Sequence, residues 1–274
     1  MRKIATIILN RNLPAITDRL CEHISQYDGD LTDIYVLEAG SDEDKLSRHT
    51  TWHANSPDIM AQGLRYGRGM NFALVQLLNE GKYDHYEAYF LLTNDTEFKA
   101  QQTLSPLMEI LQEHPRLGIL SPCSERWGEK LLLKEQTTKY FWFIHNHAYL
   151  VRREFIESIC NREQPHFMDF FFDGTNFRGY GSEHELIAKA YANDWAAAIT
   201  SEVWAGENES YLLENAAQIK TEAYEENLKL YISEGRQWMR RKYGFNSHWS
   251  MQQYVKSFYD KFFEFYPEYS KYKI

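Results

Sequence analysis

Acidic residues with metal-binding or catalytic potential stand at two places in the chain. Asp95 closes the polar triplet Thr93-Asn94-Asp95, which directly follows an apolar run. A carboxylate at the end of a buried strand can hold a divalent cation against phosphate groups, because such hard cations need few protein carboxylates. The alternative is a turn residue or a helix N-cap, since Asn and Asp are favoured at both positions whatever the function.

Glu183 and Glu185 form the second acidic pair, at the start of a helix expected over residues 183–193. A positioned Glu can take a proton from a hydroxyl group as a general base. The alternative is helix capping, because the helix dipole favours carboxylates in the first turn and Ser182 with Glu185 has the spacing of a capping box. Tyr180 precedes the pair in an aromatic, glycine-containing loop.

The hydrophobic pattern predicts the scaffold that positions these residues. Short apolar runs alternate with segments in which apolar residues recur at helical spacing. The expected strands cover residues 4–9, 34–37, 89–92 and 118–120, and the expected helices cover 17–27, 69–78 and 104–112. Alternation of this kind predicts an α/β fold with a mostly parallel central sheet. Ligands of such sheets bind beyond the carboxyl ends of the strands, which is where Asp95 is expected.

The pattern changes in the second half of the chain. Strand-like segments are expected at 140–144 and 148–151, followed by an aromatic loop at about 167–181. The end of the chain is helical in character and rich in aromatic residues. We therefore expect a main α/β domain over residues 1–211 and a helical extension over 212–274.

Composition excludes several functional classes. The formal net charge is −9 and the sequence pI is about 5.6, which argues against a protein that coats a nucleic-acid backbone. No run approaches the ~20 consecutive apolar residues of a membrane-spanning helix. The HExxH, Walker A and GxGxxG motifs are missing from the sequence. The three cysteines (Cys21, Cys123 and Cys160) lack metal-ligand spacing, so we expect reduced thiols and a cytoplasmic location.

Further polar motifs stand where a ligand site of such a sheet is expected. They are NRN at residues 10–12, EAGS at 38–41, GRGMNFA at 67–73, LTNDT at 92–96 and the stretch from FDG at 172–174 to SEHEL at 182–186. Their order resembles that of glycosyltransferase family 2, a family of inverting enzymes with the GT-A fold. The resemblance covers about residues 3–210 and is closest to the branch of rhamnosyl and similar bacterial polysaccharide transferases.

This resemblance implies a nucleotide-sugar-binding domain of the GT-A type. It further implies transfer of a sugar, with inversion, from a UDP- or dTDP-sugar to a saccharide or glycolipid acceptor in the synthesis of a bacterial polysaccharide or glycoconjugate. Glu183 matches the catalytic base, and Asp95 matches the metal ligand of the DXD element, which implies a Mn²⁺ or Mg²⁺ cofactor.

Donor and acceptor contacts follow from the same match. Donor contacts are expected for Asn10, Asn12, Glu38, Arg68, Asn71, Asn94 and Asp95. The acceptor side is expected to include Tyr180, Glu185 and His147. His145 and His147 would share one face of a strand, but two ligands do not close a metal site, which favours the lining of an acceptor pocket.

The chain departs from the family pattern at three places. Thr93 stands where many members have the first Asp of DXD, and Ser182 stands where the family often has Glu. The His that often follows the next strand is missing near residues 203–205. These departures leave the metal requirement open and keep a second hypothesis, a degenerate GT-A module that binds glycan or acts as a scaffold. A nucleotidyltransferase is disfavoured, because residues 10–14 lack its glycine-rich, basic signature.

The C-terminal extension carries an apolar stripe at helical spacing. Its members are Met251, Tyr254, Val255, Phe258, Phe262 and Phe265. Packing against the α/β domain is the favoured explanation. The other is a contact with a protein partner or with the inner face of a membrane, because basic residues cluster nearby. These are Arg236, Arg240, Arg241 and Lys242.

Overall fold

A mixed nine-stranded sheet forms the centre of the molecule. The computed structural model describes residues 4–124, 128–133, 137–144 and 148–274. The strands are ordered β3-β2-β1-β4-β8-β6-β9-β5, with β7 paired to β9. In the first half, β1 (Ile4–Asn10) pairs in parallel with β2 (Thr32–Ala39) and β4 (Ala88–Thr93), and β2 pairs in parallel with β3 (Thr50–Ala54). The α/β fold class predicted from the hydrophobic alternation is confirmed.

Antiparallel pairs complete the sheet. β8 (Ala148–Arg152) lies antiparallel between β4 and β6 (Leu117–Ser124), and β6 pairs in parallel with β9 (Ala196–Glu207). β9 also pairs antiparallel with the short strands β5 (Thr96–Phe98) and β7 (Thr138–Tyr140). The backbone N–H of Asn208, just after β9, donates to the carbonyl oxygen of Asp95 at 2.9 Å. β9 therefore returns the chain to the edge of the sheet at which β4 ends.

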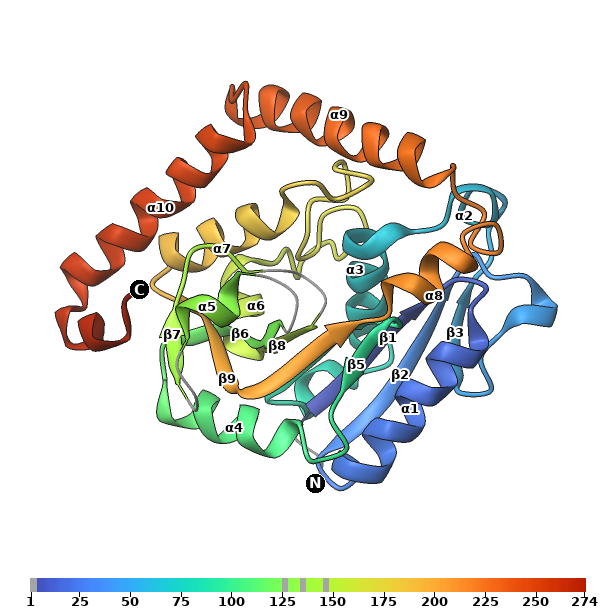
Figure 1. The fold of residues 1–274 in the computed structure, drawn as a ribbon, viewed down its shortest axis with the longest axis horizontal. Helices are drawn as coiled ribbons and strands as arrows, with labels where there is room; N and C mark the ends of the chain where they lie inside the picture. Colours follow the sequence, from blue (N-terminus) through green and yellow to red (C-terminus); the bar gives the residue numbers. More distant parts are fainter. Residues whose placement is uncertain (1–3, 125–127, 134–136, 145–147) are drawn as a thin grey trace.

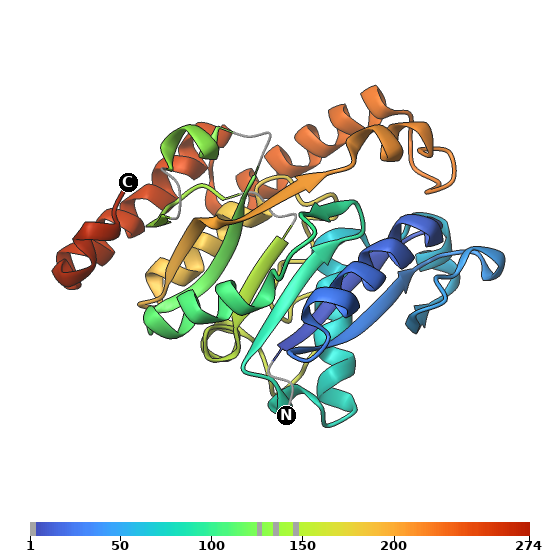
Figure 2. The ribbon, with the colours of Figure 1, turned by 60° about the horizontal axis from the view of Figure 1, so that its bottom comes forward.

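Helices cover both faces of the sheet (Figures 1 and 2). α3 (Arg65–Asn79), α6 (Arg153–Ile159) and α7 (Ser182–Ala192) lie on one face, and α1 (Pro14–Asp28) and α4 (Leu104–Glu113) lie on the other. The shorter elements are α2 (Pro57–Gln62), α5 (Glu129–Leu132), η1 (Glu43–Lys45), η2 (Tyr83–His85) and η3 (Pro267–Tyr272). The chain then forms α8 (Glu209–Glu214), α9 (Tyr224–Tyr243) and α10 (His248–Phe265). Figure 1 shows α9 and α10 as a bent arch outside α7.

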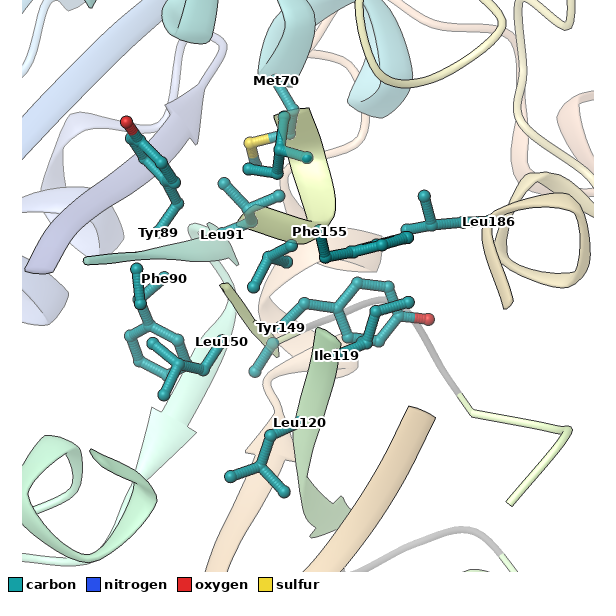
Figure 3. Close-up of a cluster of buried hydrophobic side chains, with 14 of the residues drawn as sticks. Met70, Tyr89, Phe90, Leu91, Ile119, Leu120, Tyr149, Leu150, Phe155 and Leu186 are labelled. Atoms are coloured by element: carbon teal, nitrogen blue, oxygen red, sulfur yellow. The ribbon is translucent and has the colours of Figure 1, made fainter. Parts of the chain in front are cut away.

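Side chains that alternate along the central strands fill the core on both faces (Figure 3). The register places Phe90 beside Leu150, and both point away from α3 and α6. The neighbouring pair, Leu91 and Tyr149, points to the opposite face, toward Phe155. All five side chains are fully buried. This alternation explains why β4 and β8 are apolar at every position before their last residues, Thr93 and Arg152, since both faces of the sheet are covered.

The apolar stripe of the C-terminal extension packs against the protein. Val255 and Phe262 are buried and belong to the same hydrophobic core as the central strands, and α10 packs against α7. Phe265 is the exception, with 70% of its surface exposed. The expected boundary between residues 211 and 212 falls inside α8. In the described part of the chain, no helix is both long and apolar enough to cross a membrane.

The expected strands and helices of the first 120 residues all form, within a few residues of their expected ends. The strand expected at 140–144 is wrong, because β7 ends at Tyr140 and the chain continues irregularly. β3 and α2 were not expected, since their short segments carry polar residues and no clear periodicity. Gly40 explains the tight approach of α2, because its φ is +85° and a Cβ there would lie 2.2 Å from the carbonyl oxygen of Ile59.

Candidate functional site

A cavity of about 240 Å³ lies where β1 and β4 end. These strands pair in parallel, so the residues after them meet at one edge of the sheet. Asn10 is the last residue of β1, and Asn94 and Asp95 come directly after β4. All three residues line the cavity. The structure therefore brings together three of the residues for which the sequence predicted donor contacts.

The two asparagines hold this edge through one side-chain network. Asn94 Nδ2 donates to Asn10 Oδ1 at 3.0 Å and to Thr17 Oγ1 at 3.1 Å. Asn10 Nδ2 in turn donates to Glu38 Oε2 at 2.9 Å. Each amide is at least nine-tenths buried. The network fixes the loops after β1, β2 and β4 relative to one another, and so sets the position of Asp95.

Asp95 is the acid that lines the cavity, and its side chain is buried. Burial raises the pKa of its carboxyl group, and the nearby Glu97 and Glu209 raise the pKa further, although a hydrogen bond with Thr93 opposes them. A buried carboxylate beside other acids is stabilised by a cation. One carboxylate is sufficient where phosphate oxygens complete the shell, so Asp95 fits a divalent cation bound together with a phosphate ligand.

Two arginines line the same cavity and received no role in the sequence analysis. Arg11 and Arg65 each have an Nε atom that is buried and has no hydrogen-bond partner among the described residues. Burial lowers the pKa of both guanidinium groups, which means that each would gain from an anion. Arg65 also has a left-handed backbone, with φ of 58°. In the sequence, Arg11 follows the expected strand over residues 4–9, and Arg65 precedes the expected helix over residues 69–78. These two positions are the signal that could have identified both arginines.

The C-terminal part of the chain covers this cavity. Leu212, Ile219 and Thr221 line it from the segment that follows β9. Thr221 Oγ1 accepts a hydrogen bond from Arg65 Nη2 at 2.9 Å, and Asn12 Nδ2 donates to the carbonyl oxygen of Gln218 at 2.6 Å. We call residues 209–223 the cover segment.

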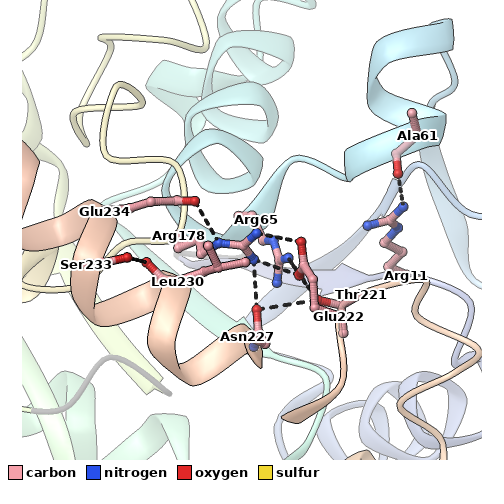
Figure 4. A network of polar contacts seen from close by, with 10 residues as sticks. All are labelled: Arg11, Ala61, Arg65, Arg178, Thr221, Glu222, Asn227, Leu230, Ser233 and Glu234. Carbon is pink, nitrogen blue, oxygen red and sulfur yellow. Dashed lines mark hydrogen bonds and ion pairs between the residues drawn. The ribbon is translucent and has the colours of Figure 1, made fainter. Parts of the chain in front are cut away.

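Arg178 holds the end of the cover segment through charged hydrogen bonds (Figure 4). Its guanidinium donates to both carboxylate oxygens of Glu222, at 2.7 and 3.0 Å, and to Glu234 at 3.1 Å. Only 7% of the Arg178 side chain is exposed. The hydrogen bond from Arg178 lowers the pKa of Glu222 to about 2. Arg65 Nη2 lies 3.5 Å from the same carboxylate, so the network joins the cover segment to the cavity wall.

Glu38 holds the turn after β2 in the structure. It is completely buried, and its carboxylate accepts four hydrogen bonds from the protein. The donors are Asn10 Nδ2, Ser41 Oγ, the Ser47 backbone N–H and Thr50 Oγ1. The donor contact expected of Glu38 stays a prediction.

Asn71 and Asn12 are likewise buried and committed to the protein. The Asn71 side chain donates to the carbonyl oxygens of Phe167 and Phe172 and accepts from the backbone N–H groups of Phe171 and Phe172. Asn12 has a positive φ of 60° and is fully buried. Both residues hold loops in the structure, and the donor contact expected of their side chains stays a prediction.

Arg68 is not among the residues that line the cavity. Its Nε donates to the carbonyl oxygen of Gly174 at 2.7 Å, and its guanidinium lies over the ring of Phe177 at 4.6 Å. Arg68 therefore stabilises the aromatic loop before α7.

Glu183 lies at the start of α7, beside Tyr180 and the first residue of α10, and 16% of its side chain is exposed. His184 Nδ1 lies 2.9 Å from Glu183 Oε1. Burial raises the pKa of Glu183, but the charges of His184 and His248 and the hydrogen bond outweigh burial and hold the pKa below its ordinary value. Neither Glu183 nor Tyr180 is among the residues that line the cavity at Asp95.

A cluster that could hold a metal ion surrounds this acid. Glu183, His184 and His248 each offer one ligand atom, and these atoms lie within 4.8 Å of one another. The rings of His184 and His248 meet edge to face, with centroids 4.5 Å apart. His248 comes from the C-terminal extension, so the sequence motif at 182–186 gave no signal for it.

Glu185 has a structural position. Its side chain is 3% exposed, and its carboxylate binds Lys242 Nζ at 2.6 Å and accepts a hydrogen bond from the Tyr243 hydroxyl group. Lys242 also binds Asp173 at 2.5 Å. These contacts hold α9 against the start of α7. The acceptor-side role expected of Glu185 and Tyr180 stays a prediction. His147 lies outside the described residues.

Comparisons with known proteins were made for sequence families, curated sequences and solved structures. No protein-family model matches the chain, and no curated protein matches it. The mannosyltransferase PcManGT from Pyrobaculum calidifontis, solved with GDP-Man and Mn²⁺, is 12% identical with a TM-score of 0.54, and the match covers 94% of this chain and 74% of that one. TarS 1–349 from S. aureus, solved with UDP-GlcNAc, is 14% identical with a TM-score of 0.53, covering 96% and 73%. GalNAc-T7, solved with UDP, GalNAc and Mn²⁺, is 10% identical with a TM-score of 0.54, covering 98% and 58%.

These similarities concern the fold. The neighbours have GT-A type nucleotide-sugar-binding domains, and this chain has the same α/β architecture followed by C-terminal helices. The expected fold class is therefore confirmed at this finer level. In this fold the cavity between Asp95 and the cover segment lies beyond the carboxyl ends of the parallel strands, where ligands of open α/β sheets bind.

Proposed function

We propose that this chain is an inverting glycosyltransferase that moves a sugar from a nucleotide-diphosphate sugar to an acceptor hydroxyl group. The observation that carries the proposal is the cavity at the end of β4, in which the buried Asp95 stands with Arg11 and Arg65. A nucleoside diphosphate is an anion that leaves the sugar, and its departure requires positive charge. Two guanidinium groups with unused donors supply that charge.

Arg11 and Arg65 bind the diphosphate through the donors that the protein leaves unpaired. Asp95 would hold a Mn²⁺ or Mg²⁺ ion, which neutralises charge on the phosphates when it is bound. The single carboxylate, with Thr93 in place of a first acid, fits an ion that is held largely by the phosphates themselves. The two arginines then neutralise the phosphate charge that remains beside an ion held by a single protein carboxylate.

Glu183 acts as the general base in this proposal. It takes the proton of the acceptor hydroxyl group as the oxygen attacks the anomeric carbon, the bond to the diphosphate breaks, and the configuration inverts. The lowered pKa keeps Glu183 ionised at neutral pH. Tyr180 lies beside it on the expected acceptor side. Since Glu183 does not line the cavity, the donor sugar is expected to extend from the cavity to α7, where one acceptor hydroxyl group can contact both Glu183 and the anomeric carbon.

The resemblance to family 2 and its polysaccharide-synthesising branch supports a UDP- or dTDP-sugar as donor and a saccharide or glycolipid as acceptor. The second candidate function is a degenerate GT-A module that binds glycan or acts as a scaffold. Thr93 in the place of the first DXD acid favours this candidate.

Calorimetric titration with UDP, dTDP, GDP and CDP, each with and without Mn²⁺, tests the proposal. We expect one nucleotide to bind, and Asp95→Ala to abolish the part of the affinity that depends on Mn²⁺. Arg65→Ala should weaken the metal-independent part by about 10- to 100-fold, because a hydrogen bond to a charged group contributes roughly 1.5–3 kcal/mol.

Asp84→Ala is the matched control, since Asp84 is an exposed acid that pairs with Arg162 on the surface. This variant should bind as the unaltered protein does. Binding of none of the four nucleotides would favour the degenerate module.

A further inference from the structure

Three residues with unpartnered buried polar atoms meet at the junction of α7 and α10. The atoms are Glu183 Oε2, His184 Nε2 and His248 Nε2, and none has a partner among the described residues. His184 is almost completely buried, with 1% of its side chain exposed. A buried polar atom that lacks a partner costs free energy, so a group of such residues is a place where a bound ligand would be stabilised.

Two of the ligand atoms already lie as close together as two ligands of one ion. His184 Nδ1 is 2.9 Å from Glu183 Oε1. A nitrogen and an oxygen that bind the same Zn²⁺ ion at about 2.0–2.2 Å each lie roughly 3 Å apart. His248 Nε2 offers a second nitrogen, and the ligand atoms of the three residues already lie within 4.8 Å of one another.

We propose that Glu183, His184 and His248 bind a first-row transition-metal ion, with Zn²⁺ as the best-suited ion. Two imidazoles and one carboxylate match the ligands that Zn²⁺ takes, whereas Mg²⁺ and Ca²⁺ prefer oxygen ligands alone. The ion would join the first turn of α7 to the first turn of α10. This site is separate from the cavity at Asp95, because none of the three residues lines that cavity.

An ion at this place has a consequence for catalysis. It would occupy the carboxylate of Glu183, which the proposed function uses as a base. Zn²⁺ is therefore expected to inhibit sugar transfer, and this single consequence rests on the proposed function. The proposed binding of Zn²⁺ does not rest on the proposed function.

The test uses the full-length chain without an affinity tag, freed of metal with EDTA and then dialysed. Calorimetric titration with ZnCl₂ should show one ion bound per chain, and saturating Zn²⁺ should raise the thermal unfolding midpoint, because the ion binds only the folded state. MgCl₂ should give neither effect. Co²⁺ should give a visible absorption band when it binds, which reports nitrogen and oxygen coordination directly.

His248→Gln should weaken Zn²⁺ binding at least 10-fold and remove the rise in the unfolding midpoint. The matched control is His85→Gln, an exposed histidine of η2, which should bind Zn²⁺ unchanged. Circular dichroism checks that the His248→Gln variant is folded. Asp95→Ala should also bind Zn²⁺ unchanged, which separates this site from the donor cavity.

Two results would overturn the proposal: no saturable binding of one Zn²⁺ per chain, or equal affinity in His248→Gln. Neither measurement needs a donor or an acceptor. Failure of the metal site and failure of the transferase proposal can therefore be told apart.

Discussion

Glu38 and Asp95 look alike in the sequence, since each acid follows a buried strand, but their surroundings differ. Four protein donors surround the Glu38 carboxylate. Asp95 lines a cavity, and burial together with the neighbouring acids raises the pKa of its carboxyl group. A polar side chain whose hydrogen-bonding capacity the protein does not use is therefore a candidate ligand-binding residue. Its position in a sequence motif does not by itself distinguish it from a structural residue.

At the same scale, Glu183→Gln tests the assignment of the base. We expect the rate of sugar transfer to fall by about 100-fold or more, because a general base contributes roughly 10²- to 10⁴-fold. Nucleotide affinity should stay unchanged, because Glu183 does not line the cavity. Kinetics of transfer and calorimetry of nucleotide binding measure the two effects separately. The exposed Glu163→Gln serves as control, and near-normal transfer by a folded Glu183→Gln would contradict the assignment.

The sequence could predict individual site residues only in part, for a physical reason. Asp95, Asn10 and Asn94 meet as expected because parallel strands place their carboxyl ends together. The sequence could not predict the surroundings of Asn71, since a side chain that binds four backbone groups in a loop has the same place in the sequence as one that binds a ligand. Which way a polar side chain faces depends on contacts with residues about 100 positions away.

Among the elements, the cover segment and the start of α9 decide access to the cavity. A volume of about 240 Å³ is below the ~300–1,000 Å³ of ordinary small-molecule pockets. We therefore expect the cover segment to shift when the proposed nucleotide-sugar donor binds. α9 packs closely against the aromatic loop before α7, because a Cβ at Gly235 would lie 2.5 Å from the Cβ of Tyr180.

The pairing of Glu222 with Arg178 should make the stability of this region depend on pH. The pKa of Glu222 is about 2 in the folded protein and lies near 4.5 without the pairing. A folded-state pKa below the unfolded one stabilises the protein above about pH 4.5, and this contribution is lost as the pH falls from there toward 2. We expect about 1 kcal/mol at pH 7, since the Glu222 side chain is 38% exposed and solvent screens the pair.

Urea unfolding of the unaltered protein and of Glu222→Gln measures this difference in the free energy of unfolding. The difference should shrink between pH 5 and pH 3. In an Arg178→Ala background the same substitution should show no such pH dependence, which isolates the pair. An equal difference at both pH values would contradict the role of Arg178.

The sequence predicted that this region is helical, but it did not predict where the region lies against the α/β domain. Helical spacing of apolar residues predicts α10 and the side that it buries. It does not reveal that the chain between β9 and α9 lies over the ends of β1 and β4. That position depends on charged contacts such as the one between Arg178 and Glu222, which have no periodicity in the sequence.

For the whole molecule, the hydrophobic core joins the extension to the sheet. Phe262 is 2% exposed, and its ring contacts the rings of Tyr140 and Tyr191. Tyr140 ends β7 and Tyr191 lies in α7. A core shared in this way predicts that α10 and the sheet unfold together.

Phe262→Ala should therefore lower the global free energy of unfolding by about 3–5 kcal/mol in a single transition. Phe265→Ala on the same helix should change it by less than about 0.5 kcal/mol, because Phe265 is 70% exposed. Urea unfolding followed by tryptophan fluorescence and by far-ultraviolet circular dichroism checks both. Two separate transitions would instead support a boundary at residues 211 and 212 between independent units.

The cavity at Asp95 is built from residues as far apart in the chain as Leu9 and Thr221. During synthesis the chain emerges from its N-terminus, and the sheet edges are available long before the cover segment. A ribosome-bound chain that ends before residue 221 would expose Arg11 and Asp95 without their cover. The complete lining of the cavity should consequently form only after residue 221 has been synthesised, when all strands of the sheet up to β9 have already been made.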